Sequence, residues 1–533
     1  MAGARVGANA GASGGIVGLR RDPSAAQRER HDLIVIGGGI YGAMTALEAA
    51  RRGLRPLLLE RDDYGGATSW NSHRIVHGGL RYLQRLDLGR FFTSVRERRW
   101  FLQHFPELVA PLPCLMPLYG EGLRRSSVMR VALATNHLLS RHRNENVRSD
   151  RRLESGGVMT REETLALFPT ARTEGLQGGA FWYDAVMTDS QRVLMETLRW
   201  ACAAGARCLN YMEVTGLELD GGRVRGVRAV DRTGDATDGR GRDRRERRGG
   251  DRTGDRAAHT ELAFEAEVVV NCAGPWVAAL AGTLADRDTG GADDRDAELF
   301  SPSLAFNLLF ERPAPSEVAV GVSAPGAGSH TWFLYARAGL LYAGTAHCPI
   351  PRDATWPAAA PPRPTNEQLD EAIEQINAAV PGLELRRHQV ARMYSGLLPA
   401  QRGQSASLVR HPVIRDHGTV AGAGRGAVAG LFSVSGVKYT TARDVAEQVL
   451  RRAFEPLPPI REDAARPAAA LLPKLPATGD ALDRDTLAAL QRLADEEAAI
   501  EPDDLLLRRG GWADDPRRAE ALARTVASLL GRG

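Results

Sequence analysis

The stretch from residue 31 to residue 60 consists of two short apolar runs on either side of a helical pattern. Residues 32–36 are apolar after their first position, which is typical of a strand buried on both faces. Helix-forming residues follow at 41–52, and their apolar positions recur at helical spacing. Gly53 stands where a helix C-cap is expected, and residues 55–59 form the second apolar run. The pattern therefore predicts a strand, a helix and a second strand in succession.

Three glycines in the turn after the first strand have the spacing of a dinucleotide-binding motif. Gly37, Gly39 and Gly42 form G-x-G-x-x-G. The first permits a tight turn, the second lets a phosphate approach the backbone, and the third lets the helix pack against the strand. Glu60 ends the second strand, where a carboxylate can accept hydrogen bonds from a ribose. These features predict a dinucleotide site, whose pyrophosphate would lie at the helix N-terminus. The alternative is a structural unit with no ligand.

A loop rich in small and hydroxylic residues follows at residues 63–83. Its glycine pair beside a histidine gives a backbone that can lie close to a flat ring. An ordinary serine and glycine loop has the same composition, but this one leaves the sheet edge where the cofactor is expected. The cofactor-binding candidates in it are Thr68, Ser69, Ser72, His77, Gly78 and Gly79.

Three later strands also end near small or charged residues. A buried strand at 268–270 leads into a Gly-Pro-Trp turn, and a strand at 431–434 leads into a turn that ends in Lys438. A lysine and a helix N-terminus at a strand end would stabilise negative charge on a reduced ring. These strand ends and the edge of the strand at 212–219 add the candidates Val214, Ala273, Gly274, Ser435, Gly436 and Lys438.

The remaining pattern indicates further domains. Strand-like runs with glycine breaks at 300–348 predict antiparallel sheet. A proline- and alanine-rich linker at 456–478 precedes two helical patterns, at 481–498 and 515–531. Residues 231–258 are Asp, Arg and Gly with almost no apolar residues, which predicts a disordered insertion because such a segment cannot pack a core.

Composition narrows the class of protein. A chain of 533 residues is long enough for two or three domains, and its net charge of +4 with no basic-aromatic motif argues against nucleic acid as a partner. Five scattered cysteines without a C-x-x-C pair favour a reduced intracellular protein with no metal site. Residues 1–30 lack an apolar signal region and predict a disordered tail. With no apolar run of membrane-spanning length, we expect a cytoplasmic protein, and peripheral contact with the inner face of a membrane stays open.

The chain resembles the flavin-dependent glycerol-3-phosphate dehydrogenases of the respiratory type, within the wider D-amino-acid-oxidase-like group of FAD enzymes. The resemblance extends from Asp32 to the end of the chain. It rests on the segments DLIVIGGGIYGA, ATSWNSHRIVHGGLRYL, NCAGPW, MYSGLLP, SVSGVKYTTAR and EPDDLLLRRGGW. HGGLRYL after the glycine unit is specific, and the last segment is similar to that family's tail motif.

The resemblance implies FAD as the cofactor and a fold that is α/β locally and α+β overall. It has a doubly wound FAD-binding domain, an antiparallel-sheet substrate domain and a small helical C-terminal domain. The expected FAD-binding segments are 31–108, 185–300 and 390–455. The expected substrate-domain segments are 109–184 and 301–389, and residues 456–533 form the linker and the helical domain.

The resemblance also implies a reaction and residue roles. A hydride would pass from a C–H beside a hydroxyl of a small anionic substrate to the flavin N5, and electrons would then pass to a quinone or another acceptor. Arg81 would orient the substrate, and Tyr82 would donate a hydrogen bond to it. His77 or His347 would accept the hydroxyl proton, and Lys438 would stabilise the reduced flavin.

Part of the family's substrate pattern is altered. The family's Y-S-G-x-R-P carries an arginine that binds phosphate, and Leu398 stands in its place here. Asn307 lies near the position of a family histidine, and residues 344–347 read Gly-Thr-Ala-His instead of Gly-Thr-Thr-Asp. Leucine cannot make the charge-assisted contact of an arginine with phosphate. The cofactor half of the site is therefore predicted to be intact and the substrate half to be altered.

Two other functions stay open. An FAD-dependent amine or amino-acid oxidase or dehydrogenase could use the same scaffold, and Leu398 favours it. A flavin-binding protein without turnover would keep the cofactor half and no reaction. The sequence predicts no oligomeric state.

Overall fold

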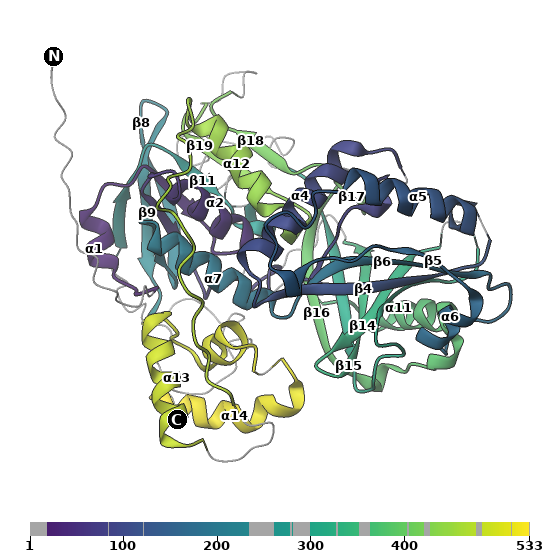
Figure 1. Cartoon of the computed structure of the whole chain (residues 1–533). Coiled ribbons are helices and arrows are strands. Elements are labelled where there is room, and N and C mark those ends of the chain that lie inside the picture. The colour runs from purple at the N-terminus through teal and green to yellow at the C-terminus, as the bar shows by residue number, and fades with distance from the viewer. Residues whose placement is uncertain are drawn as a thin grey trace.

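The computed structural model describes residues 19–83, 85–120, 122–233, 261–277, 280, 299–326, 329–350, 363–401, 404–419, 427–475, 482–512 and 514–531. These residues form a nucleotide-binding domain, a domain built on a large sheet, and a helical C-terminal domain (Figure 1). The C-terminal helices lie against the nucleotide-binding domain and beside the large sheet (Figure 1).

The nucleotide-binding domain is built on a six-stranded sheet. Its strands, in spatial order, are β18 (Val413–Asp416), β19 (Leu431–Ser435), β11 (Val269–Asn271), β1 (Leu33–Ile36), β2 (Pro56–Leu59) and β7 (Arg207–Leu209). Neighbours are parallel except that β18 runs antiparallel to β19. The predicted strand, helix and second strand are confirmed, with the helix α2 at Ile40–Ala50.

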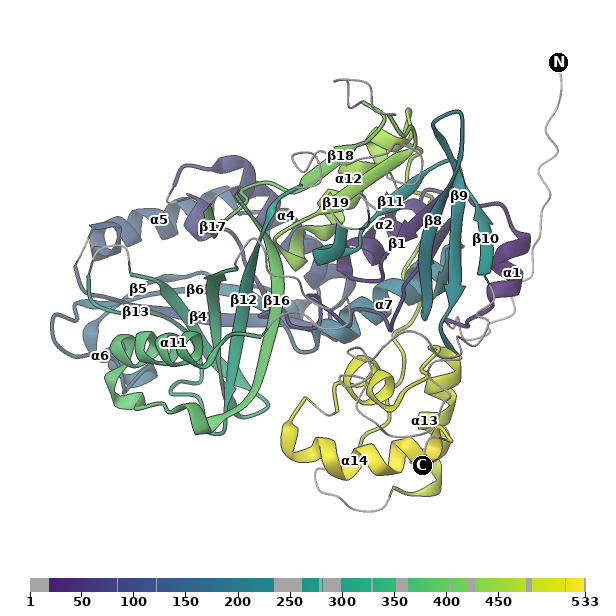
Figure 2. The same ribbon diagram turned by 180° about the vertical axis from the view of Figure 1, so that it is seen from behind.

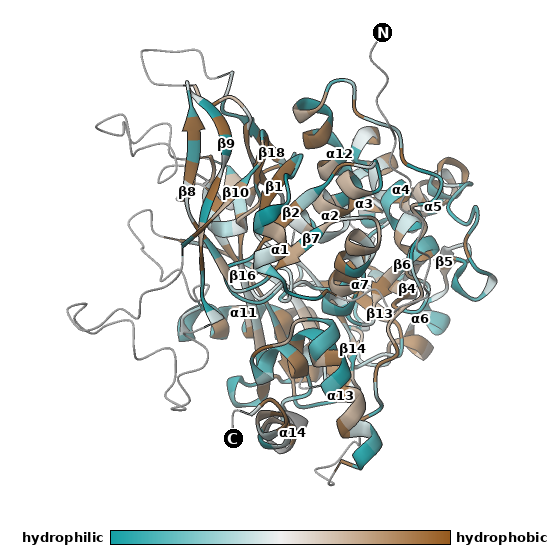
Figure 3. Ribbon diagram, turned by 90° about the vertical axis from the view of Figure 1, so that its left-hand side faces the viewer, coloured by the Kyte–Doolittle hydropathy of each residue, from teal (hydrophilic) through white to brown (hydrophobic). Residues whose placement is uncertain are grey.

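Both faces of this sheet are covered, which explains why β1 and β2 are buried along their whole length. On one face, Leu33 and Val35 pack in a core with α2, α7 (Ser190–Ala203) and α12 (Ala442–Ala453). On the other face, Ile34 and Ile36 pack against a three-stranded antiparallel sheet of β8 (Met212–Asp220), β9 (Arg223–Asp231) and β10 (Glu261–Glu265). Figure 3 shows the hydrophobic colour along β1 between these layers.

The large sheet faces the nucleotide-binding domain. Its strands, in spatial order, are β17 (Gln404–Leu408), β16 (Val390–Gln401), β12 (Ser301–Phe310), β15 (Leu340–Pro349), β14 (Thr331–Arg337), β13 (Ala319–Ser323), β4 (Val109–Leu118), β6 (Gly178–Met187) and β3 (Ile75–Val76), and β5 (Gly157–Met159) pairs with β6. The predicted antiparallel arrangement is confirmed for every pair except β13 and β4, which are parallel. Helix α11 (Asn366–Ala379) packs on one face (Figure 2).

Four strands of the large sheet lie wholly or partly outside the limits predicted for the substrate domain. β16, β17 and β3 fall in segments predicted for the FAD-binding domain, and β6 crosses the boundary predicted after residue 184. Strand pairing joins segments that are distant in the sequence, so the apolar pattern of a strand does not identify its neighbours. The sequence pattern therefore indicates where a strand lies, but it does not indicate to which sheet the strand belongs.

The described part of the chain before the first strand, residues 19–32, contains a helix. A helix, α1 (Pro23–Arg28), is capped by Asp22, whose side chain accepts the Ala25 N–H at 2.8 Å. Leu19 and Ala26 are buried. The prediction of a disordered tail over residues 1–30 is therefore wrong from residue 19 onward, because a few apolar side chains suffice to hold this segment against the core. Residues 1–18 lie outside the described part, as does the predicted insertion at 231–258 apart from residues 231–233.

Further helices connect the sheets: α3 (Leu80–Leu83), α4 (Leu88–His104), α5 (Ser126–Leu139) and α6 (Arg161–Leu167). The C-terminal domain contains α13 (Arg484–Glu496), the π-helical turn η7 (Asp504–Arg509) and α14 (Pro516–Leu529), close to the two predicted helices. Among the helices of the described residues, none has both the length and the hydropathy needed to cross a bilayer.

Buried ion pairs fasten the C-terminal domain to the other two. Arg509 binds Asp63 with two contacts, of 2.5 and 2.8 Å. Asp514 accepts hydrogen bonds from Arg74 and from the Tyr394 hydroxyl, each at 2.8 Å, and it also pairs with Arg337. The tail motif of the sequence thus supplies contacts between domains.

Candidate active site

A cavity of about 2080 Å³ lies between the nucleotide-binding domain and the large sheet. Of the residues that the sequence singled out for the site, all but Gly42 and Gly78 line it. The cavity also reaches residues of the C-terminal domain. The tertiary structure therefore brings the predicted residues together from five separate segments of the chain.

The glycine turn is shaped by close backbone contacts. Gly37 has a φ of 103°, and a Cβ on it would lie 2.6 Å from the Cys272 carbonyl oxygen. A Cβ on Gly42 would lie 1.9 Å from the Gly37 carbonyl oxygen, so this glycine packs α2 against β1 and is not exposed to the cavity. Only glycine fits either position without moving the backbone.

Glu60 ends β2 as predicted and is held by two backbone groups. Its carboxylate accepts the Gly38 N–H at 2.6 Å and the Asp62 N–H at 2.9 Å. Burial and the charge of Asp62 raise the pKa of this carboxyl. The two hydrogen bonds orient the carboxylate at the cavity wall beside the glycine turn, where a ribose hydroxyl could donate to it.

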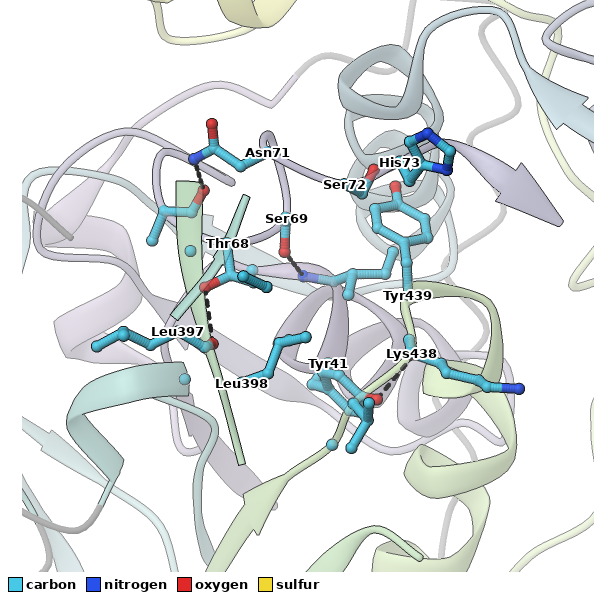
Figure 4. A pocket seen from close by; sticks show the side chains of 18 of the residues that line it. Tyr41, Thr68, Ser69, Asn71, Ser72, His73, Leu397, Leu398, Lys438 and Tyr439 are labelled. Carbon is cyan, nitrogen blue, oxygen red and sulfur yellow. Dashed lines mark hydrogen bonds between the residues drawn. The ribbon is translucent and has the colours of Figure 1, made fainter. Parts of the chain in front are cut away.

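The hydroxyl groups of the following loop fasten it to three elements, and Figure 4 shows the contacts of Ser69 and Thr68. Ser69 Oγ accepts the Ile40 N–H at 2.9 Å, which places Ser69 at the N-terminus of α2, the phosphate end of the site. Thr68 Oγ1 donates to the Leu397 carbonyl oxygen on β16 at 3.3 Å. Ser72 Oγ donates to the Ser190 hydroxyl at the start of α7 at 3.1 Å. The loop is therefore a fixed wall of the cavity.

The turn after β19 packs against the start of α2. The Tyr41 hydroxyl donates to the Lys438 carbonyl oxygen at 2.8 Å (Figure 4), and a Cβ on Gly436 would lie 2.0 Å from that hydroxyl. Burial raises the pKa of Tyr41. The contact fixes the backbone of Ser435 to Lys438 along one side of the cavity.

Tyr82 lies between two cations. The Lys438 Nζ is 4.1 Å from the centre of the Tyr82 ring, and the Arg90 guanidinium carbon is 4.5 Å from it. Burial lowers the pKa of Lys438. Burial alone would raise the pKa of the Tyr82 phenol, but the charge of Lys438 and its hydrogen bond outweigh that effect, so the pKa is lowered. The Lys438 ammonium is thus engaged with Tyr82.

A carboxylate that the sequence did not single out stands behind His77. Asp184 Oδ2 is 3.5 Å from His77 Nδ1, and its other oxygen accepts the Gly78 N–H at 2.6 Å and an Arg98 N–H at 2.8 Å. Burial would raise the pKa of Asp184, but His77 and Arg98 hold it below its usual range. Gly78 is needed because a Cβ there would lie 2.1 Å from Arg98 Nη1. Asp184 is the last residue of the segment GGAFWYD (residues 178–184). Its aromatic neighbours in the sequence gave no indication that it would face a histidine.

The far end of the cavity is lined by a cationic group on the large sheet and the nearby loops. His347 and Arg81 were predicted, whereas His330 and Arg124 were not. His347 Nδ1 is buried and has no hydrogen-bond partner among the described residues. Burial, together with His330 and Arg81, lowers the pKa of His347 to about 4. Leu398 and Asn307 also line the cavity.

The nucleotide end contains a stacked pair that the sequence did not reveal. The Arg61 guanidinium carbon lies 4.3 Å from the centre of the Trp276 ring. Glu501 and Arg508 of the C-terminal domain line the cavity as well. Trp276 belongs to the NCAGPW segment, but its pairing with Arg61 depends on the tertiary structure.

The residues present fit an extended FAD. The glycine turn and the start of α2 suit a pyrophosphate, and Glu60 suits a ribose. A Cβ on Gly274 would meet no atom within 4 Å, so the backbone there is open to a flat ring along the cavity wall. The residues that line the cavity include both Glu60 and His347, so it has walls that an isolated nicotinamide domain would not need.

Comparison with known proteins supports FAD as the cofactor. A model of the family described as FAD dependent oxidoreductase matches residues 32–448. The glycerol-3-phosphate dehydrogenase of Synechocystis sp. is 29% identical over 451 residues, which cover 82% of this chain and 73% of that protein. The aerobic glycerol-3-phosphate dehydrogenase of Bacillus subtilis is 27% identical over 427 residues, covering 79% of this chain and 66% of its own length.

Solved structures support the fold. The glycerol-3-phosphate dehydrogenase of Bacillus halodurans, complexed with FAD, has a TM-score of 0.64 at 22% identity and covers 97% of this chain and 95% of its own. The L-alpha-glycerophosphate oxidase of Mycoplasma pneumoniae, with FAD bound, has a TM-score of 0.50 at 14% identity and covers 80% of this chain and 95% of its own. The predicted fold class, with its small helical C-terminal domain, is confirmed.

Proposed function

The chain belongs to the family of FAD dependent oxidoreductases, and on that premise we propose that it oxidises the alcohol carbon of a small phosphorylated polyol of the glycerol 3-phosphate type. The observation that carries the proposal is the single cavity, in which the glycine turn at one end is continuous with the cationic residues at the other. The curated relatives named glycerol-3-phosphate dehydrogenase support it.

FAD, when bound, supplies a two-electron acceptor for the hydride. Its phosphates would be held by the turn of Gly37 and Gly39, and its ribose by Glu60. Gly42 and Gly78 would act only through packing. The remaining wall of the cofactor site would be made by Thr68, Ser69, Ser72, His77, Gly79, Val214, Ala273, Gly274, Ser435, Gly436 and Lys438.

His77 is the better candidate for the base that accepts the hydroxyl proton. Asp184 faces its Nδ1, which favours the tautomer whose Nε2 can take up a proton, and the carboxylate stabilises the imidazolium that forms. His347 lacks such a partner, and its cationic surroundings disfavour a second proton there. Arg81 would attract the anionic group of the substrate, and the buried Tyr82 and Lys438 would hold the wall beside it.

Electrons would leave for a quinone or another acceptor. Arg85 lines the cavity, and the apolar side chains of Leu86, Leu88 and Phe92 are exposed close to it in the chain. Such a surface is suited to peripheral contact with a membrane, where quinones dissolve. These exposed side chains support a protein that contacts a membrane peripherally, and the cytoplasm and the inner face of the membrane stay our proposal for its location.

The direct test is anaerobic bleaching of the flavin band near about 450 nm by glycerol 3-phosphate, hydroxy acids and amines in turn. Glycerol 3-phosphate should bleach it, and His77→Asn should lower kcat by about 10²- to 10⁴-fold. His142→Asn, an exposed histidine outside the cavity, is the matched control.

Other outcomes select the alternatives. Bleaching by amines or amino acids alone, with peroxide release in air, would establish an amine or amino-acid oxidase, which Leu398 favours. A yellow protein that none of these compounds bleaches would be a flavin-binding protein without turnover. A colourless protein that takes up no added FAD would refute all three.

A further inference from the structure

Two histidines and an arginine come together on the large sheet at the end of the cavity. His347 lies on β15, and His330 precedes β14, the neighbouring strand. Their ring centres are 6.4 Å apart, and His330 Nε2 is 2.9 Å from the Thr345 carbonyl oxygen. Arg124 Nη2 donates to Thr331 Oγ1, next to His330, at 3.1 Å. Arg124, His330 and His347 all line the cavity.

No acid balances these groups within the described residues. The ionisable side chains that act on the two imidazoles are Arg81, which acts on both, and His330, which acts on His347, and each of these effects lowers a histidine pKa. Neither Arg81 nor Arg124 forms an ion pair in the part of the chain described. Two arginines and two imidazoles that line a cavity, with no carboxylate paired with them among the described residues, form an arrangement that a bound anion stabilises.

His347 carries a second indication of a ligand. Its Nδ1 is buried with no hydrogen-bond partner among the residues described. A buried nitrogen without a partner is unfavourable, and most such groups in proteins are satisfied. An anionic oxygen would supply the partner once Nδ1 carries a proton.

The group formed by Arg124, His330 and His347 lies away from the strand that carries Leu398. His347 pairs with Ala305 on β12, and Ala305 pairs with Gly396 on β16, two residues before Leu398. β12 thus separates the cationic group from the strand that carries the leucine. Both positions line the same cavity, so charge absent from one strand is present two strands away.

We propose that the anionic group of the substrate binds between Arg124, His330 and His347, with Arg81 completing the subsite, so that these residues replace the arginine absent at Leu398. The proposal rests on the proposed function for the identity of the substrate. It assigns the specificity for a phosphate-like dianion to β14, β15 and the turn η1 (Gly122–Arg124).

The FAD-loaded full-length protein is titrated with sulfate, and the change in flavin absorbance measures sulfate binding. The same protein is then assayed for oxidation of glycerol 3-phosphate. Arg124→Ala and His330→Asn should each weaken sulfate binding and raise KM for glycerol 3-phosphate by about ten- to a hundredfold, with kcat within about threefold. Arg125→Ala removes the same charge from the next residue, which is exposed and outside the cavity, and should change neither value.

A pH series separates binding by the histidines from a structural role. Sulfate keeps its charge over this range, so a gain in affinity between about pH 8 and about pH 5 reports proton uptake by the protein. Wild type should gain at least about tenfold over this range because the unliganded imidazoles are neutral and the bound anion favours their protonation. The His330→Asn/His347→Asn double variant should lose most of that gain, while Arg81 and Arg124 stay charged throughout.

The outcomes distinguish the two proposals. If wild type oxidises glycerol 3-phosphate and the variants leave its KM unchanged, the subsite is wrong and the proposed function stands. If the variants lose sulfate binding but the enzyme oxidises only hydroxy acids, the subsite stands and the phosphorylated substrate is wrong. If sulfate does not bind and glycerol 3-phosphate does not bleach the flavin, both proposals fail.

Discussion

The two ends of the cavity are built in opposite ways. The nucleotide end is made by one continuous stretch, and its shape depends on positions such as Gly37 and Gly42, where any side chain would strike the backbone. The proposed substrate end is made by Arg124 of η1 and by His330 and His347, which lie beside and on the neighbouring strands β14 and β15. Backbone contacts of this kind allow no substitute residue, whereas a charge can be moved to another strand facing the same cavity.

The C-terminal domain connects these two ends. Asp63, beside the nucleotide end, binds Arg509, and Asp514 binds Arg74 and Arg337 near the large sheet. Buried ion pairs stabilise little in total, but removal of one partner leaves the other charge buried and unpaired. The domain therefore holds both halves of the site in place.

The largest effect is expected from Gly42→Ala. The added Cβ would meet the Gly37 carbonyl oxygen at 1.9 Å, so either the helix or the turn must move. We expect a loss of about 3 kcal/mol or more in stability and a protein that purifies without FAD. Thermal unfolding and the flavin-to-protein absorbance ratio measure both. Gly89→Ala, at a glycine with no atom near the added Cβ, should change neither. If Gly42→Ala binds FAD and has normal stability, the claim that the nucleotide end tolerates no substitute residue at this position is wrong.

Asp514→Asn should have the next largest effect. It leaves Arg74 and Arg337 buried without their partner, at a cost of about 3 kcal/mol at pH 7. Burial would raise the pKa of Asp514, but the two arginines lower it to about 2. Its contribution is therefore complete above the ordinary pKa of an aspartate and is lost as pH falls from about 4 to about 2.

Urea unfolding of Asp514→Asn and wild type at several pH values checks this. The difference in unfolding free energy should shrink over that acid window, and Asp495→Asn, at an exposed aspartate on α13, should stay close to wild type. An equal difference at all pH values would mean that the ion pairs are not its source.

Glu60→Gln should weaken FAD binding by about ten- to a hundredfold, because a neutral amide accepts ribose hydrogen bonds less strongly than a carboxylate. Titration of the apoprotein with FAD measures the dissociation constant. Glu265→Gln, at an exposed position on β10, should bind FAD as wild type does. Unchanged affinity in Glu60→Gln would remove Glu60 from the cofactor site.

Leu398→Arg is expected to have the smallest effect. It tests most directly whether the charge of the substrate end has moved to another strand. If the cationic group already binds the anion, a new arginine two strands away should lower KM for glycerol 3-phosphate by less than about tenfold. Leu398→Met keeps the volume and should leave KM unchanged. A gain near a hundredfold would instead show that the substrate end lacks an anion site of its own.

Local patterns predicted the elements well. The strands β1 and β2, the helix α2 and the helices of the C-terminal domain lie within a few residues of their predicted limits. The errors concern partners. β16 pairs within the large sheet although its segment was predicted for the FAD-binding domain, and residues 19–30 contain a helix although they were predicted to be disordered, because pairing and packing with distant segments decide both.

The residues of the site show the same difference between what local sequence patterns predict and what contacts with distant segments decide. Asp184 and His330 were missed because neither has a neighbour in the sequence that marks its chemistry. Asp184 is recognised only when His77 is found at its carboxylate, and His330 only when β14 pairs with β15. Ser69 was predicted as a cofactor-binding residue, and only the tertiary structure shows that its hydroxyl accepts the Ile40 N–H at the start of α2.

The amino-acid sequence alone determined the nucleotide end of this protein, because the glycines and Glu60 act through backbone geometry within one short stretch. It also determined the family, since those residues and HGGLRYL keep their spacing. Only the tertiary structure decided the substrate end, where Arg124, His330 and His347 meet. Their proximity depends on strand pairing and on the packing of distant segments, and sequence distance carries no information about it.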